Sequence, residues 1–123
     1  MSMRAVLFRA TIEHIEITPY VRMTQASKWS KQARKYLVSQ ATLAWEFKKH
    51  WNGNGHGPID YPVEISYAVH RKRWADNSNI LKALEDALQY AGIVENDKWI
   101  QGTGRTRTYR DDKSRVIVEL RRL

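Results

Sequence analysis

Carboxylate, amide and ammonium side chains recur at helical spacing between residues 76 and 86. Asp76, Asn79, Lys82 and Asp86 follow one another at intervals of three or four residues, and Asp97 comes after a glycine-containing turn. On a helix that rotates 100° per residue, Asn79, Lys82 and Asp86 lie within about 60° of one another. Asp76 precedes the first turn on the same side. A strand that enters this helix and a strand that leaves it can bring Asp76 and Asp97 together.

Such a combination suits metal-assisted cleavage of a phosphodiester. Carboxylate oxygens bind Mg²⁺, the ion activates water, and basic side chains hold the flanking phosphates. A structural role is the alternative, because Asp76, Asn77 or Ser78 can simply cap a helix and a Lys82–Asp86 pair is common on helix surfaces. The basic residues near these acids in the sequence are Arg71, Lys72, Arg73, Lys98, Arg105 and Arg107.

The segment "DNSNILKALEDAL", which begins at Asp76, and the segment "AGIVEND", which ends at Asp97, carry a resemblance to a known family. They are similar to the RusA family of Holliday junction resolvases, whose pattern is D-x-D-N-x-x-K-x-x-x-D-x-L followed by A-G-x-x-x-D-D. The upstream loop "TPYVRMTQASKWS" resembles the N-terminal loops of phage-type members. The resemblance covers nearly the whole chain. It implies a homodimeric endonuclease, dependent on Mg²⁺ or alternatively Mn²⁺, that cuts four-way junctions by paired nicks in recombination and repair.

The same resemblance assigns roles to individual residues. It implies that Asp76 and Asp97 are catalytic and bind the metal ion, and that Lys82 is a catalytic cation beside the phosphate. The residues expected to contact DNA, from the resemblance and from charge, are Arg22, Lys28, Arg71, Lys72, Arg73, Asn79, Lys98, Arg105 and Arg107.

Two positions depart from the family pattern. Ser78 stands where the second acid of D-x-D-N is expected, and Asn96 replaces the first of the paired acids. The hydroxyl of Ser78 can still bind a metal ion but brings no charge, and Asp86 or Glu95 could supply the missing carboxylate. A junction-binding protein with weakened or lost nuclease activity is therefore an alternative, and a small basic RNA-binding module is a further one.

Composition agrees with a nucleic-acid partner. The 123 residues suit one domain, which we place at 1–123. The net charge is +8 and the sequence pI about 9.9, which favours a polyanion, although a basic surface can also serve solubility alone. The chain has no cysteine and no apolar run long enough for a membrane span or a secretory signal. We expect a cytoplasmic protein of a bacterial cell, encoded by the host or a prophage, without a membrane partner.

Periodicity predicts an α+β fold, in which two helices pack on a small mixed sheet in the order β-α-β-α-β-β, as in RusA. Strands are predicted at 5–12, with a break in phase near Glu13–His14, and at 63–69. Residues 101–110 and 114–123 are predicted to form a hairpin with a turn at 111–113.

The helices are predicted from spacing and caps. The first begins after Ser27 or Ser30 and ends near Trp51. The second is closed by Gly92. The predicted inner face of the first helix is Ala33, Tyr36, Leu37, Ala41, Ala44, Trp45 and Lys48, and that of the second is Ile80, Leu84, Ala87, Leu88 and Ala91.

Trp29, Trp74 and Trp99 lie near basic residues in the sequence. We expect these tryptophans to cover the edge of the core, and stacking on DNA is the alternative.

Overall fold

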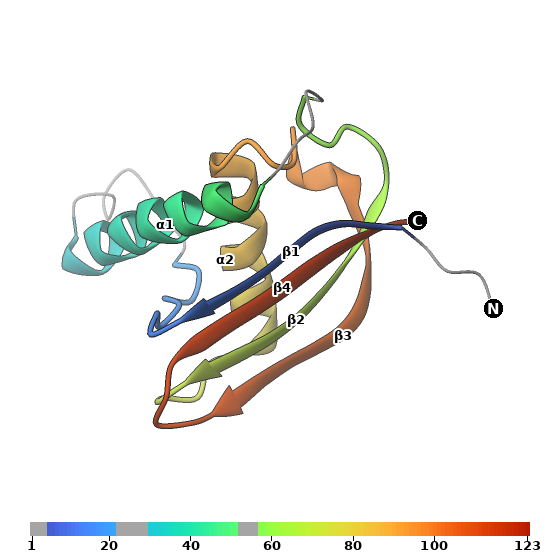
Figure 1. Cartoon of the computed structure of the whole chain (residues 1–123). Coiled ribbons are helices and arrows are strands. Elements are labelled where there is room, and N and C mark those ends of the chain that lie inside the picture. Colours follow the sequence, from blue (N-terminus) through green and yellow to red (C-terminus); the bar gives the residue numbers. More distant parts are fainter. Residues whose placement is uncertain (1–4, 22–29, 52–56) are drawn as a thin grey trace.

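The computed structural model describes residues 5–21, 30–51 and 57–123, and in these ranges two helices pack on a four-stranded sheet (Figure 1). This confirms the predicted fold class and element order. Within the described residues, neither helix is long and apolar enough to cross a membrane. The elements are β1 (Val6–Glu13), α1 (Lys31–His50), β2 (Val63–Arg71), α2 (Asn77–Tyr90), the short 3-10 helix η1 (Asp97–Trp99), β3 (Ile100–Arg110) and β4 (Arg115–Arg122).

The sheet order is β1-β4-β2-β3, so the predicted hairpin is wrong. β3 pairs with β2 in parallel, and β4 lies antiparallel between β1 and β2. The parallel pair follows from the β2–α2–β3 unit, whose helix carries the chain back to the starting edge. β4 takes a central place because Val116, Val118 and Leu120 alternate as a buried row. β3 has few apolar residues and lies at an edge.

Both helices cover one face of the sheet and leave the other face open (Figure 1). Val63, Ile65, Tyr67 and Val69 alternate toward the helices and are at most 4% exposed. β1 ends at Glu13 as predicted, and His14 adopts a φ of 61°, which breaks the alternation of the strand.

Helix α1 packs through a face that is shifted from the predicted one, with Ala33, Tyr36 and Ala44 buried as predicted. Its cap is Ser30, whose side chain accepts a hydrogen bond from the backbone N–H of Ala33. Gln40 lies at the centre of the buried face because its Nε2 donates to the carbonyl of Ala83 at 2.9 Å. The buried residues are Ala33, Tyr36, Gln40, Leu43, Ala44 and Phe47, whereas Leu37, Ala41, Trp45 and Lys48 are exposed.

Helix α2 ends in a Schellman motif at Gly92, which confirms the predicted stop. Gly92 has a φ of 75°, its N–H donates to the carbonyl of Gln89, and the N–H of Ile93 donates to the carbonyl of Leu88. The predicted inner stripe of this helix is buried throughout. The reversal directs the chain into the turn that carries Asp97.

Replacing Gly92 with alanine should lower the free energy of unfolding by about 1 kcal/mol, because a Cβ is strained at positive φ. A methyl group there would meet no atom within 4 Å, so the backbone conformation alone sets the cost. Gly57→Ala is the matched control, since Gly57 also has open space and no positive φ. Urea unfolding of both variants measures the difference, and equal losses would contradict this explanation.

Candidate active site

Asp76 occupies the N-terminal end of α2 and forms its cap. Its Oδ1 accepts hydrogen bonds from the backbone N–H and from the hydroxyl of Ser78, both at 3.1 Å. The capping role considered from the sequence is therefore real. Ser78, which stands in place of a family acid, uses its hydroxyl to stabilise the neighbouring carboxylate.

Lys82, Asp86 and Asp97 form a compact group of charges, which we call the Lys82 cluster. Lys82 Nζ lies 3.0 Å from Asp97 Oδ2 and 3.2 Å from Asp86 Oδ1. The hydrogen bond to Asp97 is the largest contribution that raises the pKa of Lys82, and the Asp86 carboxylate adds to it. The lysine consequently stays protonated beside both acids. The side chains are between 29% and 38% exposed, so the cluster is open to solvent on one side.

Two tyrosines contact the Lys82 cluster, one through Asp86 and one through Lys82. The hydroxyl of Tyr36 on α1 donates to Asp86 Oδ2 at 2.8 Å, and burial together with this bond raises the pKa of Tyr36. Tyr20 packs edge-on against Tyr36, and its ring centroid is 5.9 Å from Lys82 Nζ. Both oxygens of Asp86 are thus engaged, one by α1 and one by Lys82.

The turn before β3 presents Asp97 to the cluster. The N–H of Asp97 donates to Gln89 Oε1 at 3.1 Å, which fixes the turn against α2. Asn96 caps η1 by accepting from the N–H of Lys98 at 2.9 Å. Glu95 accepts from the indole N–H of Trp99 at 2.8 Å. The side chains of Asn96 and Glu95 therefore serve the shape of the turn.

Glu85 belongs to the same surface and was missed by the sequence reasoning. Burial raises its pKa, and repulsion by Asp97 and Asp86 adds to the shift, while the charge of Lys82 opposes it. Its position one helical turn after Lys82 was the available signal, because residues three apart on a helix are neighbours.

The predicted metal ligands fit a metal ion in chemistry but do not all converge. Carboxylate and hydroxyl oxygens are the ligands that Mg²⁺ and Mn²⁺ prefer. Asp97 contacts Lys82 and Gln89, whereas Asp76 bonds to Ser78 within the first turn of α2. In the ranges that the structure describes, no three histidine or acidic side chains are gathered closely enough to hold one ion.

The predicted DNA contacts differ in accessibility. Arg71 is only 8% exposed and donates Nη1 to the carbonyls of Arg73 and Trp74, so little of its side chain can reach DNA. Asn79 is partly buried at the first turn of α2. Arg22 and Lys28 lie outside the described residues. The remaining predicted contacts, Lys72, Arg73, Lys98, Arg105 and Arg107, are exposed.

The tryptophans fall into two classes. Trp99 is partly buried and packs on the core, which agrees with the favoured role. Trp74 is 77% exposed in the loop before Asp76, so for this residue the role of core cover is wrong. Trp29 lies outside the described residues.

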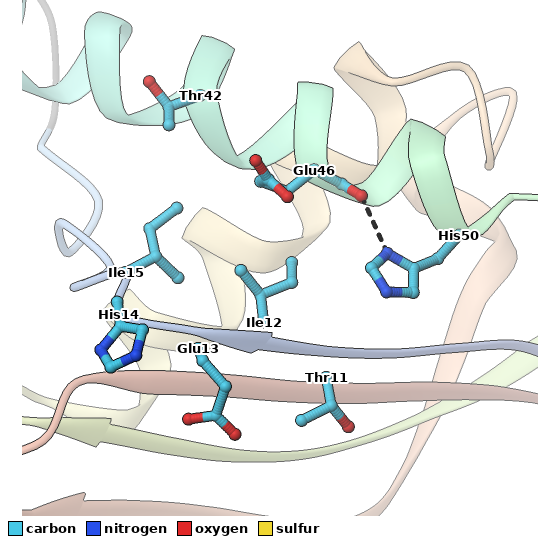
Figure 2. A pocket seen from close by; sticks show the side chains of 8 residues that line it. All are labelled: Thr11, Ile12, Glu13, His14, Ile15, Thr42, Glu46 and His50. Carbon is cyan, nitrogen blue, oxygen red and sulfur yellow. Dashed lines mark hydrogen bonds between the residues drawn. The ribbon is translucent and has the colours of Figure 1, made fainter.

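A pocket of about 280 Å³ lies between β1 and α1 and contains no predicted site residue (Figure 2). Its acids have partners elsewhere, because Glu13 lies 3.6 Å from Arg115 Nη1 and Glu46 lies 3.1 Å from Lys49 Nζ. The lining residues are Thr11, Ile12, Glu13, His14, Ile15, Thr42, Glu46 and His50.

The raised pKa of Glu85 predicts that ionisation of this side chain lowers the free energy of unfolding. The folded chain binds this proton more tightly than the unfolded chain, so the free energy of unfolding falls as the pH rises above the ordinary value of 4.5. Glu85→Gln removes that loss. We expect the variant to gain stability over the wild type between pH values of about 3.5 and 7 in urea unfolding. A constant difference across this range would contradict the assignment.

Comparison with known proteins agrees with the motif. Residues 6–121 match the family described as Endodeoxyribonuclease RusA. A protein of Aquifex aeolicus (strain VF5) named Crossover junction endodeoxyribonuclease RusA is 30% identical over 84 residues, which are 67% of this chain. The match spans 64% of the length of that relative, slightly less than two thirds. Because the family match runs from the first residue of β1 to the last but one of β4, the chain belongs to the RusA endodeoxyribonuclease family.

Proposed function

We propose that this chain is a divalent-metal-dependent endonuclease that resolves Holliday junctions and related branched DNA by paired hydrolysis of phosphodiesters. The observation that carries the proposal is the 3.0 Å contact between Lys82 and Asp97. The contact joins two residues that are 15 apart in the chain and that both match the family motif. Both lie within residues 6–121, the range that matches the family.

The proposed roles follow from the chemistry of the side chains. Asp76 and Asp97 would hold Mg²⁺ or Mn²⁺, and Ser78, Asp86 or Glu95 would complete the ligands. The ion, when bound, would activate water and stabilise charge on the phosphoryl oxygens. Lys82 would exchange one of its two carboxylate partners for a phosphate oxygen and stabilise the negative charge that develops there.

DNA binding is supported by the charge of the exposed surface. Lys72 and Arg73 lie in the loop just before Asp76, and Lys98 follows Asp97 directly. Arg105 and Arg107 extend the basic surface along β3, and Asn79, Arg22 and Lys28 remain further proposed contacts. Arg71 is left out of this set because its buried side chain bonds to the carbonyls of Arg73 and Trp74. Binding should weaken with salt, because each phosphate contact releases counterions.

Paired cleavage requires two sites in one complex. A symmetric homodimer provides them on opposite strands of a junction, and we propose this assembly. The proposed setting is the cytoplasm of a bacterial cell, with the gene carried by the host or a prophage.

A junction-binding protein with weakened nuclease activity is the second candidate. The hydroxyl of Ser78 bonds to Asp76 at 3.1 Å, and the Asn96 side chain is used as a cap. Neither position supplies the charge that the family pattern has there. DNA affinity would remain in this case, since the basic residues are independent of both substitutions.

Cleavage of a labelled four-way junction tests the first proposal. We expect cuts in the junction with Mg²⁺ or Mn²⁺, none with EDTA, and little cutting of a matched linear duplex. Asp97→Asn should slow cleavage more than roughly a hundredfold, because even indirect metal partners cost 10–100-fold. Asp112→Asn, at an exposed position between β3 and β4, is the charge-matched control. Tight junction binding without cuts under either metal would favour the second candidate.

Ser78→Asp tests whether the missing acid limits the site. An added carboxylate should tighten Mn²⁺ binding by roughly tenfold, because affinity for such ions rises with ligand charge. Ser78→Asn has nearly the same shape without the charge and should leave the affinity unchanged. Calorimetric titration measures binding independently of cleavage. Unchanged Mn²⁺ affinity in Ser78→Asp would exclude this position from the metal site.

A further inference from the structure

The side chain of Asn77, the first residue of α2, is tied to two strands of the sheet. Its Oδ1 accepts hydrogen bonds from the hydroxyl of Tyr67 at 2.6 Å and from that of Thr108 at 3.3 Å. Its Nδ2 donates to Thr106 Oγ1 at 3.5 Å. Tyr67 belongs to β2 and both threonines belong to β3. One amide group therefore joins the start of the helix to both strands.

These contacts are not needed to cap the helix. Asp76 already provides the cap, and asparagine is a weaker helix former than alanine. Tyr67 is 4% exposed, and burial raises its pKa to about 12. Its hydroxyl consequently remains a donor near neutral pH. The hydrogen bonds of Asn77 instead place the first turn of α2 against the sheet.

Arg71 restrains the chain on the other side of Asp76. Its buried side chain donates Nη1 to the carbonyl of Arg73 at 2.8 Å and to that of Trp74 at 3.4 Å. A buried guanidinium requires hydrogen-bond acceptors, and the carbonyls of the loop between β2 and α2 supply them for Nη1. The loop is thereby held two residues before the acid.

We propose that Asn77 and Arg71 are positioning residues that bracket Asp76 and hold its carboxylate in the orientation needed for phosphodiester cleavage. This inference rests on the proposed function, in which Asp76 binds the metal ion. The carboxylate itself bonds to Ser78 within its own turn. Its placement relative to the sheet therefore depends on the residues at either side. A shift of about 1 Å in a catalytic group can cost roughly a hundredfold in rate.

Isosteric substitutions on the sheet test the inference without altering α2. Tyr67→Phe and Thr108→Val each remove a hydroxyl that donates to Asn77, and Thr108→Ser retains it as the matched control. We expect the first two to slow single-turnover cleavage of a four-way junction by roughly tenfold. The junction Kd should stay within about twofold, because phosphate contacts set the affinity. Thr108→Ser should cleave like the wild type.

Asn77→Ala should slow cleavage at least as much as Tyr67→Phe. The Tyr67 hydroxyl also donates to the backbone carbonyl of Asn77 at 3.1 Å, a bond that Asn77→Ala keeps. The losses of rate in Asn77→Ala and Tyr67→Phe should therefore combine less than additively in the double variant, because the two substitutions share only the bond to Asn77 Oδ1. Unchanged rates in these variants would overturn the inference. A parallel loss of rate and DNA affinity would also overturn it, since the residues would then hold DNA and not the acid.

Hydrogen exchange distinguishes failure of this inference from failure of the proposed function. The amides of Ser78, Asn79 and Ile80 should exchange faster, relative to α1, in Tyr67→Phe and Thr108→Val than in the wild type. Faster exchange supports the restraint even if the wild type cuts no DNA, an outcome that would refute the nuclease proposal alone. Unchanged exchange would overturn the restraint.

Discussion

The ammonium group of Lys82 is the point at which both helices and the turn before β3 are joined. It contacts Asp97 and Asp86, and Asp86 in turn accepts a hydrogen bond from Tyr36 on α1. Without this positive charge, the two acids and the neighbouring Glu85 would repel one another on a partly buried surface. One side chain thus ties the turn to α2 and neutralises the carboxylates, and in the proposed function it supplies the cation beside the phosphate.

Patterns among neighbouring residues predict where each helix and strand of this fold lies. They predict less well which elements pair or pack with one another. The alternation from Val63 to Val69, the capped start of α2 and its glycine stop all depend on local geometry, and all three predictions are confirmed. The place of β3 was predicted wrongly, because a short turn fits a hairpin as well as a connection across the end of β2. The buried face of α1 is shifted from the predicted one for a similar reason, since the burial of Gln40 depends on a hydrogen bond from its Nε2 to the carbonyl of Ala83 on the other helix.

The candidate site could be predicted only in part for the same physical reason. The spacing of Asp76, Lys82 and Asp86 identifies one helix, and the motif adds Asp97. The contact of Asp86 with Tyr36 joins residues 50 apart and has no local signal. That Asp97 lies beside Asp76 stays a prediction, and the contact of Asp97 with Lys82 of α2 was not predicted. Asp76 caps the same helix, so the geometry of α2 relative to the sheet affects both acids.

The measurement that tests the proposed resolvase most directly uses a supercoiled plasmid carrying an extruded cruciform. Two cuts within one complex convert the plasmid directly into linear DNA, whereas independent cuts first accumulate nicked circles. We predict that linear DNA appears from the start of the reaction with Mg²⁺ or Mn²⁺, because two symmetry-related sites act on the same junction. Accumulation of nicked circles, or intact plasmid under both metals, would contradict the proposal.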